Sequence, residues 1–290
     1  MSANLDQKTI VTARRNKLTF PRLLRSEWIK VFSLRSTWWL LALAIVFNLA
    51  IALGTAAGLR YIEFSGEFPP GLPVGSLSAN VVESCGLVGQ LLFIILAILV
   101  ITNEYSSGQI RSSFIAAPRR RRVLIAKIFI VLFLCLVIFV ISLGAAWAGS
   151  YLILADSTII DLSLTSAVSL RILGGFLAEI ALLGLLSFGL GCFIRSSAGS
   201  IATAVGLFMI LPVVAALIRL TLTRAGELAT WQQWIINLEW FLPTNAGGLV
   251  KQEVLPEGAL FGPWEGLAIL GAWTLFALIL GFIRVAHRDA

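Results

Sequence analysis

Glu179 is the side chain whose position most strongly suggests a chemical role. It lies in the run GGFLAEIALLGLL, which is otherwise apolar. A carboxylate inside a membrane-spanning helix costs several kcal/mol unless it is protonated, paired or in contact with water, so such a residue is a functional candidate. Arg171 is about two turns away on the same helix, so a partner must come from another helix or from a second copy of the chain. The alternative is a structural role, in which a neutral Glu179 hydrogen-bonds neighbouring helices.

The common catalytic motifs are absent from the sequence. None of the five lysines follows a glycine, so the phosphate-binding loop GxxxxGK[ST] is missing and the chain does not hydrolyse ATP by that route. The single histidine, His287, excludes a zinc-binding HExxH motif. Cys85, Cys135 and Cys192 fall in or beside apolar runs and are expected to behave as small apolar residues. We therefore predict no catalytic, cofactor-binding or metal-binding residue, and no enzyme.

Six long apolar runs must position Glu179. Hydrophobic residues make up 58% of the 290 and charged residues only 13%, far from the composition of a soluble domain. A run of about 20 apolar residues is long enough to cross a bilayer as a helix. The fold class is therefore an all-α integral membrane protein. Its six transmembrane helices are expected near Trp38–Gly58, Ala79–Ile101, Val123–Leu154, Ser169–Ile194, Ser200–Ile218 and Trp264–Ile283.

Basic residues predict the orientation of these helices. Seventeen of the 22 lysines and arginines fall on one side of the six runs. Lys and Arg are retained on the cytoplasmic side, so both the N-terminus and the C-terminus are expected there. This placement, together with anionic lipid, accounts for the net charge of +7, and no nucleic-acid partner is expected. The predicted parts are a cytoplasmic segment (1–37), a transmembrane domain (38–283) and a cytoplasmic tail (284–290).

An amphipathic helix is predicted just before the first span. Apolar residues recur there at steps of three and four, with basic and hydroxyl residues largely on the other side. The apolar positions are Phe20, Leu23, Leu24, Trp28, Val31 and Phe32. Such a helix can lie in the membrane interface, with the apolar face in the acyl boundary and the basic face in water. The alternative is a helix packed against the ends of the spans.

Three connections carry further information. The connection 102–122 reads TNEYSSGQIRSSFIAAPRRRR, and its Ile110 and Phe114 could form the apolar edge of a short helix that Pro118 would end. It is either a docking element or a charged loop that only directs insertion. The connection 195–199 is predicted to be a tight turn. In the external segment 219–263, tryptophans at helical spacing suit the headgroup region, which predicts an interfacial or re-entrant element before the last span.

The chain resembles the bacterial ABC type-two permeases, particularly those of actinobacteria. The resemblance rests on RSEWIKVFSLRSTWW leading into the first span and on NEYSSGQIRSSFIAAPRRRRVLIAK between the second and third spans. It implies a six-span export-type membrane domain that pairs with a second permease copy or paralogue. It also implies separate cytoplasmic ABC ATPase subunits, which would carry the ATP and Mg. The residues implied to couple to the ATPase are Glu104, Tyr105, Gly108, Ile110, Arg111 and Arg195.

The resulting hypothesis is the permease subunit of an ATP-binding cassette exporter in the bacterial plasma membrane, embedded in the lipid bilayer and forming the translocation path. The chain itself needs no cofactor in this hypothesis. One alternative is a membrane immunity or sensor subunit that transports nothing and uses the basic loop only to recruit a cytoplasmic partner. Another is a membrane enzyme of unknown motif. A neighbouring gene for a small ATPase with a phosphate-binding loop would favour the first hypothesis.

Overall fold

The computed structural model describes residues 19–66, 79–82, 88–109, 120–157, 165–224, 229–256 and 258–288. Within these ranges the chain forms helices and no strand. Six of the helices are long and apolar enough to cross a membrane. The predicted all-α class with six spans is therefore confirmed, and the chain is a multi-pass membrane protein by the length and composition of its helices.

The six candidate spans follow one another with short elements between them. An N-terminal helix, α1, precedes them at Phe20–Ser33. The spans are α2 (Arg35–Ser65), α4 (Val88–Ser106), α6 (Arg120–Ile138) continuing through the π-helical turn η2 (Phe139–Leu143) into α7 (Gly144–Leu154), α8 (Ala167–Ile194), α9 (Ser197–Val205) continuing through the π-helical turn η3 (Gly206–Ile210) into α10 (Leu211–Arg224), and α13 (Pro263–Arg288). Between α10 and α13 lie α11 (Thr230–Leu238), η4 (Glu239–Phe241), α12 (Pro243–Gly248) and η5 (Leu249–Lys251).

The second span extends beyond its predicted end. It was expected at Ala79–Ile101, whereas α4 begins at Val88 and continues to Ser106. Residues 79–82 are helical, and residues 83–87 lie outside the described part of the chain. The polar sequence TNEYS at its end is helical as well, and its Thr102 and Glu104 contact Ser197 and Lys127, a support that hydropathy does not register.

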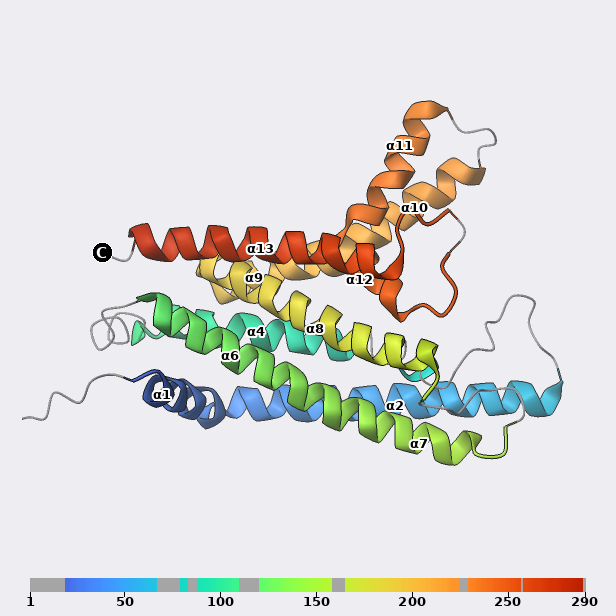
Figure 1. The fold of residues 1–290 in the computed structure, drawn as a ribbon, viewed down its shortest axis with the longest axis horizontal. Helices are drawn as coiled ribbons and strands as arrows, with labels where there is room; N and C mark the ends of the chain where they lie inside the picture. Colours follow the sequence, from blue (N-terminus) through green and yellow to red (C-terminus); the bar gives the residue numbers. More distant parts are fainter. Residues whose placement is uncertain are drawn as a thin grey trace, which may run out of the picture.

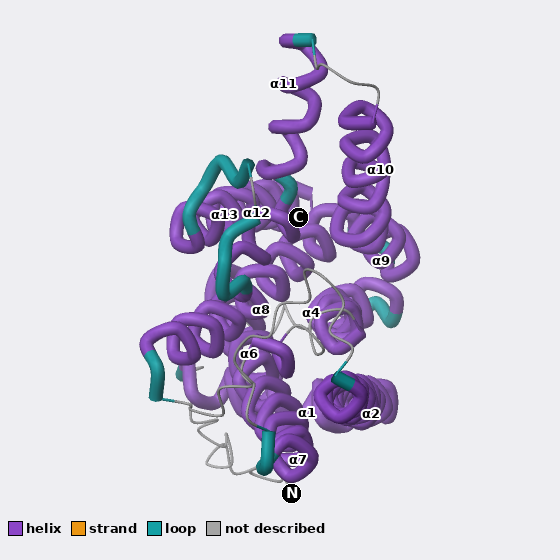
Figure 2. The backbone as a smooth tube through the Cα atoms, turned by 90° about the vertical axis from the view of Figure 1, so that its right-hand side faces the viewer, coloured by secondary structure: helices purple, strands orange, loops and turns teal. Residues whose placement is uncertain are grey.

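The helices lie side by side along the long axis of the molecule, as Figure 1 shows. One end holds α1, the last turn of α4, the start of α6, the turn between α8 and α9, and the end of α13. We call it the basic end. Helices α10 and α11 project away from the bundle near the opposite end, as Figures 1 and 2 both show. No residue of α10 is fully buried, so this helix leaves much of its surface open to lipid or to another chain.

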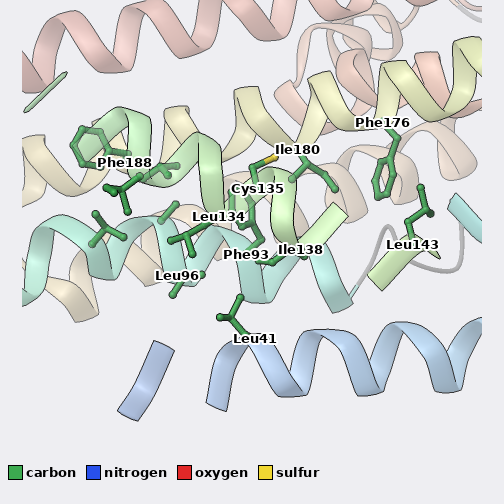
Figure 3. Close-up of a cluster of buried hydrophobic side chains, with 14 of the residues drawn as sticks. Leu41, Phe93, Leu96, Leu134, Cys135, Ile138, Leu143, Phe176, Ile180 and Phe188 are labelled. Atoms are coloured by element: carbon green, nitrogen blue, oxygen red, sulfur yellow. The ribbon is translucent and has the colours of Figure 1, made fainter. Parts of the chain in front are cut away.

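The core lies where α4 and α6 meet α8. Figure 3 shows Phe93 and Leu96 of α4 with Leu134 of α6, and both Leu41 of α2 and Phe188 of α8 belong to the same buried cluster. Helix α8 packs most extensively, against α13 and α4. Glycines allow this approach: a Cβ at Gly189 would collide with the α13 backbone at Ala277. The central position of α8 explains how a polar residue halfway along it can be shielded from lipid.

Candidate functional site

A cluster of four charged side chains, three of which are buried, lies at the basic end. We call it the charge network: Glu27 and Lys30 of α1, Glu104 of α4 and Lys127 of α6. Lys127 Nζ lies 2.5 Å from Glu27 Oε2 and 2.9 Å from Glu104 Oε1. Lys30 Nζ lies 2.7 Å from Glu27 Oε1 and 2.8 Å from Glu104 Oε1. Each lysine therefore bridges both carboxylates, and the network joins three helices.

The sequence builds this network from helical spacing. Leu23, Glu27 and Val31 recur at steps of four and form the buried face of α1, so the carboxylate points toward the bundle. Lys127 follows Val123 and Ala126, which are fully buried in the first turns of α6. Glu27 and Lys127 are each only 1% exposed. Two positive and two negative groups balance, which is the condition under which buried charges are tolerated.

Lys30 lies at the solvent side of the charge network and outside the candidate spans. Its side chain is 32% exposed. Burial lowers the pKa of Lys30, but the hydrogen bonds and negative charges of Glu104 and Glu27 raise it by more, so the pKa lies above the ordinary lysine value. Lys30 therefore carries its positive charge throughout the physiological range.

The structure brings four of the predicted coupling residues to the basic end. Glu104 belongs to the charge network, and its neighbour Tyr105 lies under Arg195, whose guanidinium carbon is 5.4 Å from the ring centroid. Gly108 follows the last turn of α4 with φ of 71°, a left-handed conformation that suits glycine. Ile110 and Arg111, the other two predicted coupling residues, lie outside the described residues.

Arg195 lies where the turn after α8 meets the ends of α4 and α13. It ends α8 with φ of 65°, and its Nη2 donates to the carbonyl oxygen of Arg284 at 2.7 Å. Ser197, two residues later, donates to Thr102 Oγ1 at 2.9 Å. The turn after α8 is therefore held against the end of α4 and the end of α13, so the connections 102–122 and 195–199 begin side by side.

A second buried ion pair holds Glu179. Its side chain is fully buried, and its Oε1 lies 3.0 Å from Lys251 Nζ. The lysine comes from the short 3-10 helix η5 of the same chain, so of the two expected sources the partner is another helix and not a second copy. Val250 packs against Gly175 so closely that a Cβ on this glycine would collide with it. Gly247 likewise packs beside the Glu179 side chain, where a Cβ would lie 3.2 Å from Cγ. The segment 243–251 is thus seated against α8.

Among the described residues, further charged side chains are buried outside the predicted spans or close to their ends, whereas Glu179 lies well inside one. Glu27, Glu104, Lys127 and Glu239 are each 5% exposed or less. In the sequence, Lys127 is one of the 17 basic residues that predict the orientation of the spans. The sequence does mark Lys127 as unusual, because it is the one charged residue in the apolar run VLIAKIFIVLFL. The burial of Glu27 could also have been inferred, because Glu27 lies four residues from both Leu23 and Val31 and therefore on the same face of the helix.

A third charged contact joins α10 to η4. Arg219 Nη1 lies 3.2 Å from Glu239 Oε1. Glu239 lies between the fifth and sixth candidate spans. Burial raises the pKa of the Glu239 carboxyl above its ordinary value, and the positive charge of Arg219 offsets only part of that rise. The projecting α10 is therefore linked to the bundle by a partly exposed arginine and a buried carboxyl group.

The described residues hold no group of three or more His, Cys, Asp or Glu side chains placed to bind a metal ion. In comparisons with known proteins, no family model and no curated protein matches the chain. Its function must therefore be inferred from the residues and their arrangement.

Proposed function

We propose that the chain is the permease subunit of an ATP-binding cassette exporter, of the ABC type-two kind, in a bacterial plasma membrane. It pairs with a second permease copy or paralogue to form the translocation path. Separate cytoplasmic ATPase subunits supply the energy, because the sequence holds no phosphate-binding loop of its own. The family resemblance of NEYSSGQIRSSFIAAPRRRR supports this proposal.

Among the structural observations, the charge network gives the proposed exporter function its main support. Glu104 lies near the start of the connection 102–122, Lys127 lies five residues after its end, and the two side chains are joined directly. Glu27 and Lys30 attach α1 to both. A displacement of the connection by an ATPase is therefore transmitted to α1, α4 and α6 together, since these helices are linked through buried ion pairs. A coupling element needs such a rigid attachment, whereas a loop that only directs insertion does not.

The proposed orientation places the basic end in the cytoplasm. The positive-inside rule supports it, because 17 of the 22 basic residues fall on this side of the spans. We expect a cysteine at Ser107 to be protected from a membrane-impermeant thiol reagent added to intact cells, and one at Thr230 to react. Both positions are exposed in the structure. Cys85→Ser provides the background, and Cys135 and Cys192 are buried. Labelling of residue 107 from outside would overturn the orientation.

The test of function begins with the genes beside the one that encodes the chain, where the proposal requires a small ATPase with a phosphate-binding loop. We expect this ATPase and the chain to co-purify, and Arg111→Ala to weaken the complex by about tenfold or to uncouple ATP hydrolysis from transport, because an arginine is a multidentate donor. Arg111 is a cleaner probe than Glu104, whose loss would also disturb the charge network. The matched control is Arg60→Ala, because Arg60 lies at the opposite end of the bundle and pairs with Glu63 at 2.9 Å.

Unchanged association and coupling in Arg111→Ala, or an equal loss in Arg60→Ala, would contradict the proposed role of the connection. Failure of the neighbouring ATPase to bind the wild-type chain would contradict the exporter itself.

A further inference from the structure

A cavity of about 490 Å³ lies beside the charge network, between the junction of α1 with α2 and the last turns of α4. Its volume falls within the range of about 300–1,000 Å³ that is usual for ligand sites. The lining residues that are exposed or half-buried are mostly polar, and Lys30, Ser36, Asn103 and Ser107 are among them. The cavity can therefore accept a polar group that forms hydrogen bonds.

The charged group that this cavity presents is the ammonium of Lys30. The side chain of Lys30 is 32% exposed, whereas those of Glu104 and Lys127, which also form part of the wall, are 6% and 2% exposed. Glu27, the fourth member of the charge network, is 1% exposed and is not part of the wall. The network is neutral as a whole, but its exposed member is positive, so the cavity favours an anion.

The rim of the cavity adds to this positive sign. Arg35 is exposed beside Ser36, and it forms no ion pair within the described part of the chain. Arg35 is also the first residue of α2, and no side chain caps the N-terminus of this helix. The positive end of the helix dipole therefore lies where Leu34 and Ser36 line the cavity.

Neutral hydrogen-bond donors line the cavity as well. The side-chain amide of Asn103 and the hydroxyl of Ser36 take part in no hydrogen bond with the described residues, and neither residue is buried. An amide offers two N–H donors and a hydroxyl offers one O–H donor. Together with the Lys30 ammonium they match an oxyanion that accepts several hydrogen bonds, such as a phosphate group.

The cavity lies at the level where a membrane interface is expected. The first turns of α2 carry Trp38 and Trp39, which are 57% and 69% exposed. Exposed tryptophans at the end of a span mark the headgroup region. The phosphate groups at this level belong to phospholipids, and basic side chains near the membrane surface attract the anionic ones.

We propose that this cavity binds the headgroup phosphate of one anionic phospholipid. Lys30, Asn103 and Ser36 donate hydrogen bonds to the phosphate oxygens, and the acyl chains stay in the surrounding bilayer. The inference requires only that the helices lie in a membrane. It does not depend on the proposed exporter function, so each can fail without the other.

The test measures lipid retention by the purified full chain in detergent. Phosphatidylglycerol and phosphatidylcholine are added in equal amounts, and bound lipid is measured by native mass spectrometry. Because the choline group neutralises the phosphate charge, we expect about tenfold more phosphatidylglycerol than phosphatidylcholine to be retained. Equal retention of the two lipids would overturn the proposal.

A competition experiment separates a lipid headgroup from a soluble phosphate. Sodium phosphate is added in large molar excess over phosphatidylglycerol, and sodium chloride of the same ionic strength is the reference. We expect the retained phosphatidylglycerol to be the same in both salts. Its displacement by phosphate alone would assign the cavity to a soluble anion and overturn the lipid assignment.

Two charge variants locate the site. Lys30→Met removes the charged donor and should lower the ratio of phosphatidylglycerol to phosphatidylcholine from about ten to about one. The matched control is Arg25→Met, which removes one positive charge from the exposed face of α1 outside the cavity and should keep most of the preference. An unchanged ratio in Lys30→Met, or an equal loss in Arg25→Met, would show that diffuse positive charge retains the lipid and would contradict the proposal.

Asn103→Leu tests the cavity without a change of charge. Leucine is similar in size to asparagine but has no N–H donor, so the ratio is expected to fall to about threefold. The full preference in Asn103→Leu would place the phosphate outside the cavity and contradict the proposal.

Discussion

Replacing Lys127 with methionine is expected to lower the free energy of unfolding by about 3–5 kcal/mol. The side chain of Lys127 is only 2% exposed and neutralises two carboxylates from α1 and α4. Methionine fills a similar volume but leaves a net negative charge among groups that water does not reach. Thermal unfolding of the purified chain in detergent measures the effect, and the midpoint should fall by on the order of 10 °C.

Lys30→Met is the matched control. Lys30 contacts the same two carboxylates, but its side chain is 32% exposed. Water can therefore replace many of the hydrogen bonds that Lys30 donates to them. The expected loss is about 1 kcal/mol. Adding Glu104→Gln to Lys127→Met restores charge balance, because Glu27 and Lys30 then remain as a neutral pair, and most of the lost stability should return. Equal effects of the two single lysine variants would show that burial does not decide the strength of this network.

The six spans could be predicted from sequence because each must satisfy its backbone within one helix and present apolar side chains to lipid. The helix α1 was predictable for a similar reason, since its apolar residues repeat at helical spacing. The bounds of the helices were harder to predict from the sequence. The first span was expected at Trp38–Gly58, whereas α2 runs from Arg35 to Ser65. Its last residues are polar enough to end a hydropathy run but have no helix breaker until Gly66, which has a positive φ of 69°.

Hydropathy could not show which spans are buried by other helices. In its most apolar 18-residue stretch, the span Ser197–Arg224 has a mean hydropathy of 2.6 and 11% of the residues buried, whereas the corresponding stretch of Val88–Ser106 has 1.8 and 61%. Lipid tails and neighbouring helices are both apolar, so a run of leucine and valine fits either environment. The less apolar span can be the more buried of the two because its polar residues Gln90, Thr102 and Glu104 lie within the protein instead of facing lipid.

The charged partners could not be derived from sequence either. Glu27 and Lys127 are 100 residues apart, and Glu179 and Lys251 are 72 apart. Their pairing depends on how helices cross, which no local pattern records. A buried charge signals only that a partner must exist. For Glu179 the sequence therefore supports the need for a counter-charge but not its source in η5.

Replacing Lys251 with methionine is expected to release the segment 243–251 from α8. Glu179 is fully buried, so loss of its partner leaves an uncompensated carboxylate, at a cost of about 3–5 kcal/mol. The damage should be local, because η5 and α12 are short and are held mainly by their packing against α8 and α13. Hydrogen exchange should therefore rise in residues 243–251 before it rises in α8.

Glu179→Gln separates the effect of charge from that of contact. Lys251 can still donate to the amide oxygen, and its own side chain is 19% exposed, so the remaining charge is partly hydrated. We expect a loss of about 1 kcal/mol. Combining Lys251→Met with Glu179→Gln leaves no buried charge, so the double variant should be more stable than Lys251→Met alone. If Glu179→Gln costs as much as Lys251→Met, the asymmetry in burial is not what holds the segment, and the close packing of Val250 on Gly175 and of Gly247 beside Glu179 is the stronger attachment.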